Sequence, residues 1–296
     1  MGFLIIEVYH SITQFDTWQF ILNIHYGLLL LSILILSFFI FCTSSLWALI
    51  VKKIDNNVEY RDCLAAYNLS LLAKYLPGGI WNLVGRALYL HKKGVSVAVT
   101  SSSIVYEFFF LITSSVTIGG FLLIEHNVVS IGAILLIYIG MLCFLFWPNT
   151  VIVILNKVLV LLKRETLSCR LSRANVLIIF LLFVLSWGIY GFAFQLLIQA
   201  MNLEFTQSLL YLLAILANSW VIGYLSPTPG GIGVREGIMT FLLGKTSVST
   251  YAALISVVSR LWFICAELLI ISIVVIAMAI QNSRGKERPD EQGVSV

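Results

Sequence analysis

Charged residues are scarce in this 296-residue sequence. Only 11% of the residues are Asp, Glu, Lys or Arg, whereas 60% are hydrophobic, and the mean hydropathy is +1.00. An ordinary globular domain is about one quarter charged, because its surface must be solvated. The shortage of charge therefore excludes a soluble globular protein.

The sequence also lacks the patterns of metal sites, disulfide frameworks and common enzymes. Its five cysteines show no CxxC spacing, and its four histidines form no i, i+4 pair. There is no nucleophile elbow, P-loop or HExxH motif, and no Asp-rich pair for a metal-bound diphosphate. We expect no metal, no cofactor, no nucleic acid partner and no enzymatic activity. No basic stretch with a cleavage site begins the chain, so no removable signal peptide is expected.

Long apolar runs are what the sequence has in abundance. Windows of about 20 apolar residues recur, which is the length that crosses a bilayer. The runs are continuous rather than alternating, which favours helices over a β-barrel. We therefore expect an all-α, polytopic membrane protein with one integral membrane domain over 1–280 and a cytoplasmic tail at 281–296.

Within that domain the apolar pattern predicts two larger units joined by a connector. The first unit covers 24–124, the connector 128–173 and the second unit 176–280. The expected spans are 24–50, 95–124, 128–147, 176–201 and 248–280, the shorter helical pieces are 60–76, 80–90, 205–225 and 232–244, and 1–22 and 149–173 are expected at the membrane surface.

Two Pro/Gly stretches interrupt the apolar pattern where a membrane protein would normally continue a helix. The stronger runs Ser226-Pro-Thr-Pro-Gly-Gly-Ile-Gly-Val-Arg-Glu-Gly237, and the fainter one runs Lys74-Tyr-Leu-Pro-Gly-Gly-Ile-Trp-Asn-Leu-Val-Gly-Arg86. Proline and glycine break helices because one lacks a backbone donor and the other favours turn conformations. The residues expected to form the breaks are Pro77, Gly78, Gly79, Pro227, Pro229, Gly230, Gly231 and Gly233.

The distribution of Lys and Arg suggests how these breaks lie in the membrane. If both broken segments are re-entrant hairpins, Lys52-Lys53 and Lys92-Lys93 fall on one face with most other basic residues, and Lys245 stands alone on the other. Span–hairpin–span then occurs twice with opposite orientation, an inverted-repeat arrangement found in secondary transporters. A Pro-kinked single crossing is the alternative for the first break, and chance recurrence of a helix breaker is the alternative for the repeat.

Seven ionisable residues fall within the membrane-embedded segments. They are Lys74, Arg86, Glu107, Arg235, Glu236, Arg260 and Glu267, a surplus of one cation. Such charges must pair or face a wet cavity. Under the repeat, Glu107 and Arg260 occupy equivalent positions and are expected to meet, and Arg260 and Glu267 share a helix face. Arginine and glycine-rich turns at helix N-termini suit phosphate, so we interpret the set as a site for an anionic head group. Internal ion pairs that only fix helix packing are the alternative.

The two motifs also carry a family resemblance. Together with Ser259-Arg260 and Ala266-Glu267, they resemble the transmembrane region of lysylphosphatidylglycerol synthases, which defines a wider group of flippase-like membrane proteins. The similarity runs from about Trp47 to Ile280. It implies the movement of a lipid between leaflets, without implying which lipid. The chain lacks the soluble aminoacyl-transferase domain of the full synthases, so lipid aminoacylation by this chain alone is not expected.

Together these observations predict a flippase-like protein of a cell inner (cytoplasmic) membrane, with its C-terminus in the cytoplasm. Its expected partner is a membrane lipid with an anionic or polyprenyl-linked head group, bound by Arg86, Arg235 and Arg260, and envelope biosynthesis enzymes are further candidate partners. The main alternative is a non-transporting accessory subunit of an envelope-glycan or lipid-modifying complex. A third is an intramembrane transferase that uses Glu236 as a base.

Overall fold

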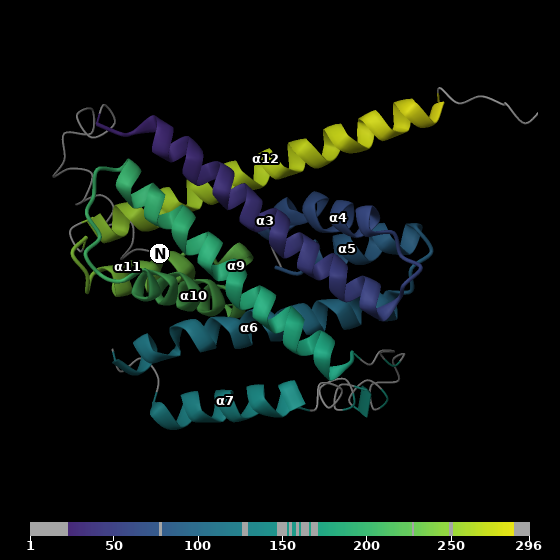
Figure 1. Cartoon of the computed structure of the whole chain (residues 1–296), viewed down its shortest axis with the longest axis horizontal. Coiled ribbons are helices and arrows are strands. Elements are labelled where there is room, and N and C mark those ends of the chain that lie inside the picture. Colours follow the sequence, from purple (N-terminus) through teal and green to yellow (C-terminus); the bar gives the residue numbers. More distant parts are fainter. Residues whose placement is uncertain are drawn as a thin grey trace, which may run out of the picture.

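The chain is helical throughout the part that the structure describes (Figure 1). The computed structural model describes residues 23–76, 79–125, 130–146, 153, 156–157, 160, 166, 171–226, 228–248 and 251–286, and no strand occurs among them. The helices are α3 (Tyr26–Ile54), α4 (Tyr60–Leu69), α5 (Trp81–Lys92), α6 (Val97–Glu125), α7 (Ile131–Phe146), α9 (Arg173–Ala200), α10 (Leu209–Leu225), α11 (Val234–Leu243) and α12 (Ala252–Lys286), with the 3₁₀ turns η1 (Leu71–Tyr75) and η2 (Pro229–Gly231).

Four of these helices are long and apolar enough to cross a membrane. They are Tyr26–Ile54, Val97–Leu122, Arg173–Ala200 and Ala252–Gln281, each far longer than the roughly 20 residues that a bilayer requires. Large apolar side chains lie exposed along them, including Leu34 and Phe38 on α3 and Leu181 and Leu185 on α9. Such surfaces suit a lipid environment, and the prediction of an all-α, polytopic membrane protein is confirmed.

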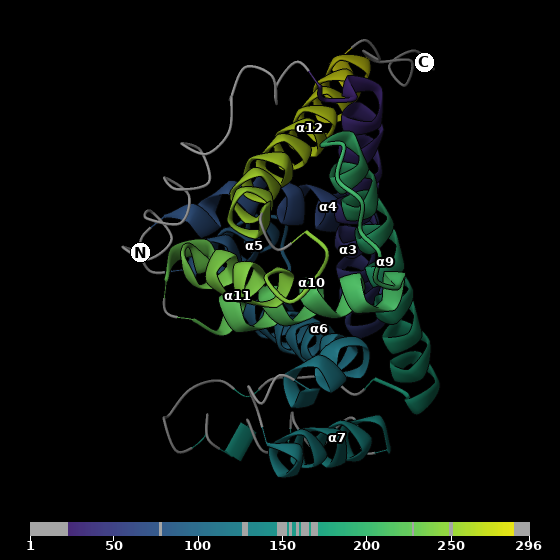
Figure 2. The same cartoon turned by 90° about the vertical axis from the view of Figure 1, so that its left-hand side faces the viewer.

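The other segments predicted from the sequence agree with the structure only in part. Helix α7 lies within the third expected span, 128–147, and is at the edge of the molecule beyond α6 (Figure 2). The expected surface segments at 1–22 and 149–173 lie outside the described residues or almost so. Helix α12 continues to Lys286, so the start of the expected tail at 281 is helical. No proline occurs between the start of α12 and Pro289, and the polar residues that follow Ile280 simply extend the helix.

The first helices of the two predicted units pack against each other in antiparallel fashion (Figure 1). At one end, the backbone N–H of His25 donates to the carbonyl of Ala200 over 2.9 Å. At the other end, Ile50 of α3 shares a buried apolar cluster with Val176 and Ile179 of α9. Helix α3 therefore ends where α9 begins, and two spans packed in this way cross a membrane in opposite directions.

In each pair of short helices around a break, α4 with α5 and α10 with α11, the start and the end of the pair are joined by a contact at its base. In the first pair, the Nζ of Lys93 lies 3.2 Å from Oδ1 of Asp62, which joins the end of α5 to the start of α4. In the second, the hydroxyl of Ser247 donates to the carbonyl of Glu204 over 3.0 Å, which joins the residue stretches after α11 and before α10. Because both ends of each pair meet, each folds as a hairpin, defined here as hairpin 1 (60–92) and hairpin 2 (209–243).

The bases of the two hairpins lie at opposite ends of α3. Hairpin 1 begins shortly after Ile54, the last residue of α3, whereas the stretch that leads into hairpin 2 is tied to the start of α3 by Asn202, which donates to the carbonyl of Asn23. A helix of 29 residues at 1.5 Å per residue is about 43 Å long. The hairpins thus point toward each other from opposite ends. Their re-entrance into a membrane stays a prediction, since it concerns the bilayer.

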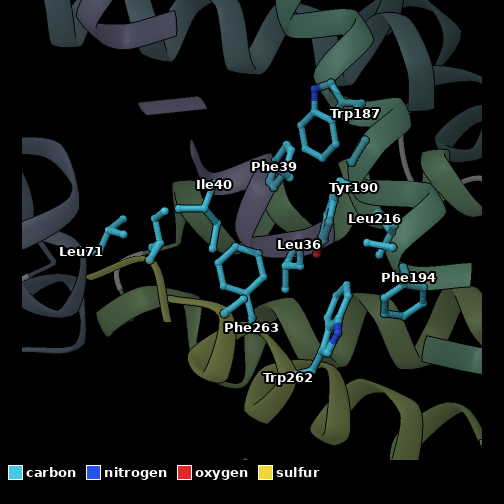
Figure 3. Packing of buried hydrophobic residues seen from close by; sticks show 14 of the residues in the cluster. Leu36, Phe39, Ile40, Leu71, Trp187, Tyr190, Phe194, Leu216, Trp262 and Phe263 are labelled. Carbon is cyan, nitrogen blue, oxygen red and sulfur yellow. The ribbon is translucent and has the colours of Figure 1, made fainter. Parts of the chain in front are cut away.

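A layer of stacked aromatic rings holds α3, α9 and α12 together (Figure 3). The ring of Tyr190 stacks between Phe39 at 5.0 Å and Trp262 at 6.2 Å. The indole N–H of Trp262 donates to the hydroxyl of Ser32 over 2.9 Å, so its burial leaves no orphaned donor. This rigid layer supports the hydroxyl of Tyr190, which reaches toward the hairpins. Trp262 is therefore a packing residue.

Candidate functional site

A cavity of about 300 Å³ lies where the two hairpin tips meet. Both breaks line it, together with α6, α10 and α12. Its wall includes the basic side chains Lys74, Arg86, Arg235 and Arg260, the carboxylate of Glu107, the amide of Asn82, the rings of Tyr67, Phe108, Trp220 and Tyr224, and the small residues Gly79, Gly223, Ser226, Thr228, Gly230 and Gly231.

Glycine shapes the break in hairpin 2 because the backbone there needs positive φ. Gly230, Gly231 and Gly233 have φ of 58°, 70° and 84°, a region that other residues enter only with strain. In hairpin 1 the described part of the break shows the same feature at Gly79, with φ of 66°. Of the residues expected to form the breaks, Gly79, Pro229, Gly230, Gly231 and Gly233 lie outside the α-helices, whereas Pro77, Gly78 and Pro227 lie outside the described residues.

Gly223 allows hairpin 2 to fold tightly around the cavity. A Cβ atom at Gly223 would lie 2.7 Å from Cβ of Arg235, and one at Gly231 would lie 2.7 Å from the carbonyl oxygen of Gly223. Contacts this short leave no room for a side chain at either position. Gly223 was not predicted to matter, although an isolated glycine in an apolar helix is a signal of close packing.

Arg86 and Glu107 form a buried ion pair in the wall of the cavity. Nη1 of Arg86 donates to Oε2 of Glu107 over 2.5 Å, and both side chains are about 5% exposed or less. The guanidinium also lies over the ring of Tyr67, 3.8 Å from its centroid. The expected meeting of Glu107 with Arg260 is therefore wrong. Hairpin 1 places Arg86 against α6, where it pairs with Glu107, whereas Arg260 of α12 pairs with Glu236.

Arg260 instead holds the tip of hairpin 2. Its Nη1 lies 3.2 Å from Oε1 of Glu236, and both terminal nitrogens donate to the carbonyl of Gly230 over 3.0 Å. The other carboxylate oxygen of Glu236 accepts the backbone N–H of Gly233 over 2.7 Å, which caps the start of α11. Glu236 is thus occupied on both oxygens, a poor state for the general base that the transferase alternative requires.

Lys74 and Glu267 join the tip of hairpin 1 to α12. The ammonium group of Lys74 donates to Oε1 of Glu267, and the hydroxyl of Tyr75 donates to Oε2 over 2.9 Å. Glu267 has no exposed surface. Arg260 and Glu267 both face the hairpin tips from α12, so the prediction that they share a helix face is confirmed.

Arg235 is a buried cation that takes part in none of the three ion pairs described above. Its Nη2 donates to the hydroxyl of Tyr190 over 2.6 Å, and its guanidinium lies 4.9 Å from the centroid of the Phe263 ring. Among the described residues no carboxylate lies within ion-pair distance of it. The side chain is only 8% exposed and lines the cavity. The surplus cation that the sequence predicted is therefore Arg235.

The start of a helix lies at each break. Helix α5 begins at Trp81, directly after Gly79 and Ile80, and α11 begins at Val234, beside Arg235. The first turn of a helix carries unpaired N–H groups and the positive end of the helix dipole, both of which attract anions. Glu236 already caps the start of α11, so the uncapped start of α5 is the break that adds partial positive charge to the cavity.

Five of the seven predicted site residues line the cavity and two support it from behind. Glu236 and Glu267 are not part of the wall, but each fixes a cation that is. Three residues in or beside the site, Tyr190, Tyr75 and Asn82, were not predicted from the sequence. Nothing local separates Tyr190 from the other tyrosines in apolar runs, because its role depends on a contact between α9 and α11.

A comparison with protein families fits this architecture. The family model described as the lysylphosphatidylglycerol synthase TM region matches residues 3–283, nearly the whole chain. The chain belongs to this family. Membership in the lysylphosphatidylglycerol synthase TM family confirms the resemblance seen in the two motifs and, with the four long apolar helices, a multi-pass membrane protein of the flippase-like group. No curated protein matches the chain closely enough to count as a relative.

Proposed function

We propose that the chain binds the anionic head group of a membrane lipid in the cavity between the hairpin tips and carries it between leaflets. The observation that carries this proposal is the buried guanidinium of Arg235, which lines the cavity without a carboxylate partner among the described residues. A buried charge is costly unless it is paired, so a phosphate arriving there supplies a missing counter-charge.

The size of the cavity indicates which part of a lipid it holds. About 300 Å³ is at the small end of the range for ligand pockets, enough for a head group but not for acyl chains. Ile80 and Tyr224 line the cavity and are also 56% and 38% exposed, so apolar surface continues from the wall to the outside of the protein. The head group is expected inside, with the acyl or polyprenyl chains left in the membrane.

The chemistry of the wall favours a phosphate and does not separate its sources. Arginine presents planar pairs of donors that match phosphate oxygens, and helix N-termini add backbone donors. A phospholipid and a lipid-linked glycan precursor both supply such a group. The proposal places the protein in a cytoplasmic membrane and involves no chemical change to the lipid.

Leaflet exchange in reconstituted vesicles tests the proposal. Purified protein is placed in liposomes that contain a fluorescent phosphatidylglycerol, and a membrane-impermeant reductant then bleaches the label in the outer leaflet. Lipid transfer exposes the inner-leaflet label to the reductant, and Arg235→Gln is expected to abolish this second phase. Arg61→Gln is the matched control, because Arg61 is exposed and pairs with Glu59 away from the cavity.

The accessory-subunit alternative predicts a different pattern. If wild-type protein and Arg235→Gln both leave the inner-leaflet label protected, and the protein co-purifies with a lipid-modifying or glycan-synthesising enzyme, the proposed transport is wrong. If both proteins transfer lipid at equal rates, the assignment of Arg235 is wrong. Only transfer that depends on Arg235 and survives Arg61→Gln supports the proposal.

A further inference from the structure

The charged side chains that line the cavity are mostly cations, and three of the four are paired with carboxylates, which leaves a surplus of one positive charge. Lys74, Arg86, Arg235 and Arg260 all contribute to its wall, whereas Glu107 is the one carboxylate among the described wall residues. Glu107 is already bound by Arg86 over 2.5 Å. A ligand inside the cavity therefore meets several cations and no carboxylate that is free to receive a positive group.

The two carboxylates behind the wall, those of Glu236 and Glu267, are also fully occupied by hydrogen bonds within the protein. Both oxygens of Glu267 accept hydrogen bonds, from Lys74 and from Tyr75. Both oxygens of Glu236 accept as well, from Arg260 and from the backbone of Gly233. Releasing either carboxylate for a ligand would leave a buried cation unpaired, which is strongly unfavourable.

Arg235 stands at the centre of this imbalance because its position is fixed. The hydroxyl of Tyr190 binds one terminal nitrogen over 2.6 Å, and Tyr190 is itself held in the stack between Phe39 and Trp262. The close approach of Gly223 to Cβ of Arg235 restrains the side chain at its other end. The donors of Arg235 that Tyr190 does not use are therefore pre-positioned on the cavity side.

We infer that the cavity selects its lipid by the charge of the head group, with Arg235 as the specificity-determining residue. It accepts a phosphate lipid that carries no positive substituent and rejects one whose head group also carries an ammonium group, such as an aminoacyl ester. This inference rests on the proposed head-group site. It also separates this chain from the lipid that gives its family its name, since lysylphosphatidylglycerol carries ammonium groups.

The aromatic wall offers an ammonium group one alternative location. Trp220 and Tyr224 line the cavity and stack on each other at 4.9 Å, and aromatic rings can receive a cation over their faces. The ring of Tyr67 is already covered by Arg86. Lys74, Arg86 and Arg260 are paired with carboxylates, so the unpaired charge of Arg235 is what repels an ammonium group at these rings, and we expect this surplus charge to prevail.

Equilibrium binding tests the inference without requiring transport. Purified wild-type protein in an uncharged detergent is titrated with dioctanoyl phosphatidylglycerol and with dioctanoyl lysylphosphatidylglycerol. Wild-type protein is expected to bind phosphatidylglycerol at least tenfold more tightly. Equal affinities, or tighter binding of the lysyl lipid, would overturn the inference. A selective protein that fails to exchange lipid between leaflets would refute the transport proposal and leave the charge selection standing.

Two variants show whether Arg235 carries the selectivity. Arg235→Gln is expected to weaken the binding of phosphatidylglycerol about tenfold and to bring the two affinities close together, whereas Arg61→Gln keeps the wild-type ratio. Arg235→Lys retains the charge and is expected to keep most of the preference, which guards against a loss of fold in the glutamine variant. A full preference for phosphatidylglycerol in folded Arg235→Gln would show that Arg235 does not determine specificity.

Discussion

The guanidinium of Arg235 donates to the hydroxyl of Tyr190 over 2.6 Å, and this contact joins hairpin 2 to the aromatic layer between α3, α9 and α12. It is a contact between a buried cation and a neutral partner. Three neighbouring cations have carboxylates, and Arg235 has none among the described residues. The site is thus organised around one charge that the protein positions without neutralising.

The first prediction concerns this contact. Tyr190→Phe keeps the ring and its stacking and removes only the hydroxyl. Hydrogen bonds to charged groups contribute about 1.5–3 kcal/mol, so the affinity for dioctanoyl phosphatidylglycerol is expected to fall about tenfold or more. Tyr138→Phe is the matched control, because the hydroxyl of Tyr138 donates to the carbonyl of Val116 on α6, away from the cavity. Equal affinities for the two variants would contradict a positioning role for Tyr190.

The second prediction tests the tight fold of hairpin 2 with two helical glycines. Gly223→Ala places a Cβ atom 2.7 Å from Cβ of Arg235, whereas Gly188→Ala meets nothing within 4 Å. Overpacking costs about 1–3 kcal/mol, and alanine in an open helical position gains about 0.5–1 kcal/mol. Thermal unfolding in detergent is expected to show a lower Tm for Gly223→Ala and an unchanged or higher Tm for Gly188→Ala. A higher Tm for Gly223→Ala than for Gly188→Ala would show that α10 and α11 do not approach each other this closely.

The third prediction concerns the pair that joins hairpin 1 to α12. Lys74→Met leaves the carboxylate of Glu267 without its cation, and removing one partner of a buried pair costs about 3–5 kcal/mol. Adding Glu267→Gln is expected to restore much of the lost stability, because no uncompensated charge remains. A double-mutant cycle on the free energy of unfolding measures this coupling. If the two effects are simply additive, the residues do not form a pair in the membrane.

The charge pattern and the breaks could be interpreted from sequence because both are local signals. Proline next to consecutive glycines strongly disfavours a helix, so the tips of both hairpins were predictable at Gly79 and Gly230. Partners were harder to predict. The repeat alone led us to expect a contact between Glu107 and Arg260. In the structure Glu107 instead accepts a hydrogen bond from Arg86 of hairpin 1. Pairing in a membrane protein depends on which helices touch, and no single segment contains that information.

The fourth prediction tests the orientation of the hairpins. In a variant without native cysteines, single cysteines replace Asn57 and Lys93 at the base of hairpin 1, and Glu204 and Lys245 at the base of hairpin 2. A membrane-impermeant thiol reagent is expected to label the first two from one side of the membrane and the other two from the opposite side. Labelling of Asn57→Cys and Lys93→Cys from different sides would exclude the first hairpin as a re-entrant element. Labelling of all four from one side would exclude the inverted arrangement.

The most direct test of the account is an experimental structure of the protein with bound dioctanoyl phosphatidylglycerol. The account predicts the phosphate inside the cavity, with its oxygens about 2.8 Å from the terminal nitrogens of Arg235, and the acyl chains leading out past Ile80 and Tyr224. Arg235→Gln, treated in the same way, is expected to lose that phosphate. A lipid bound only on the outer surface of the helices, with the cavity holding water alone, would contradict the central claim.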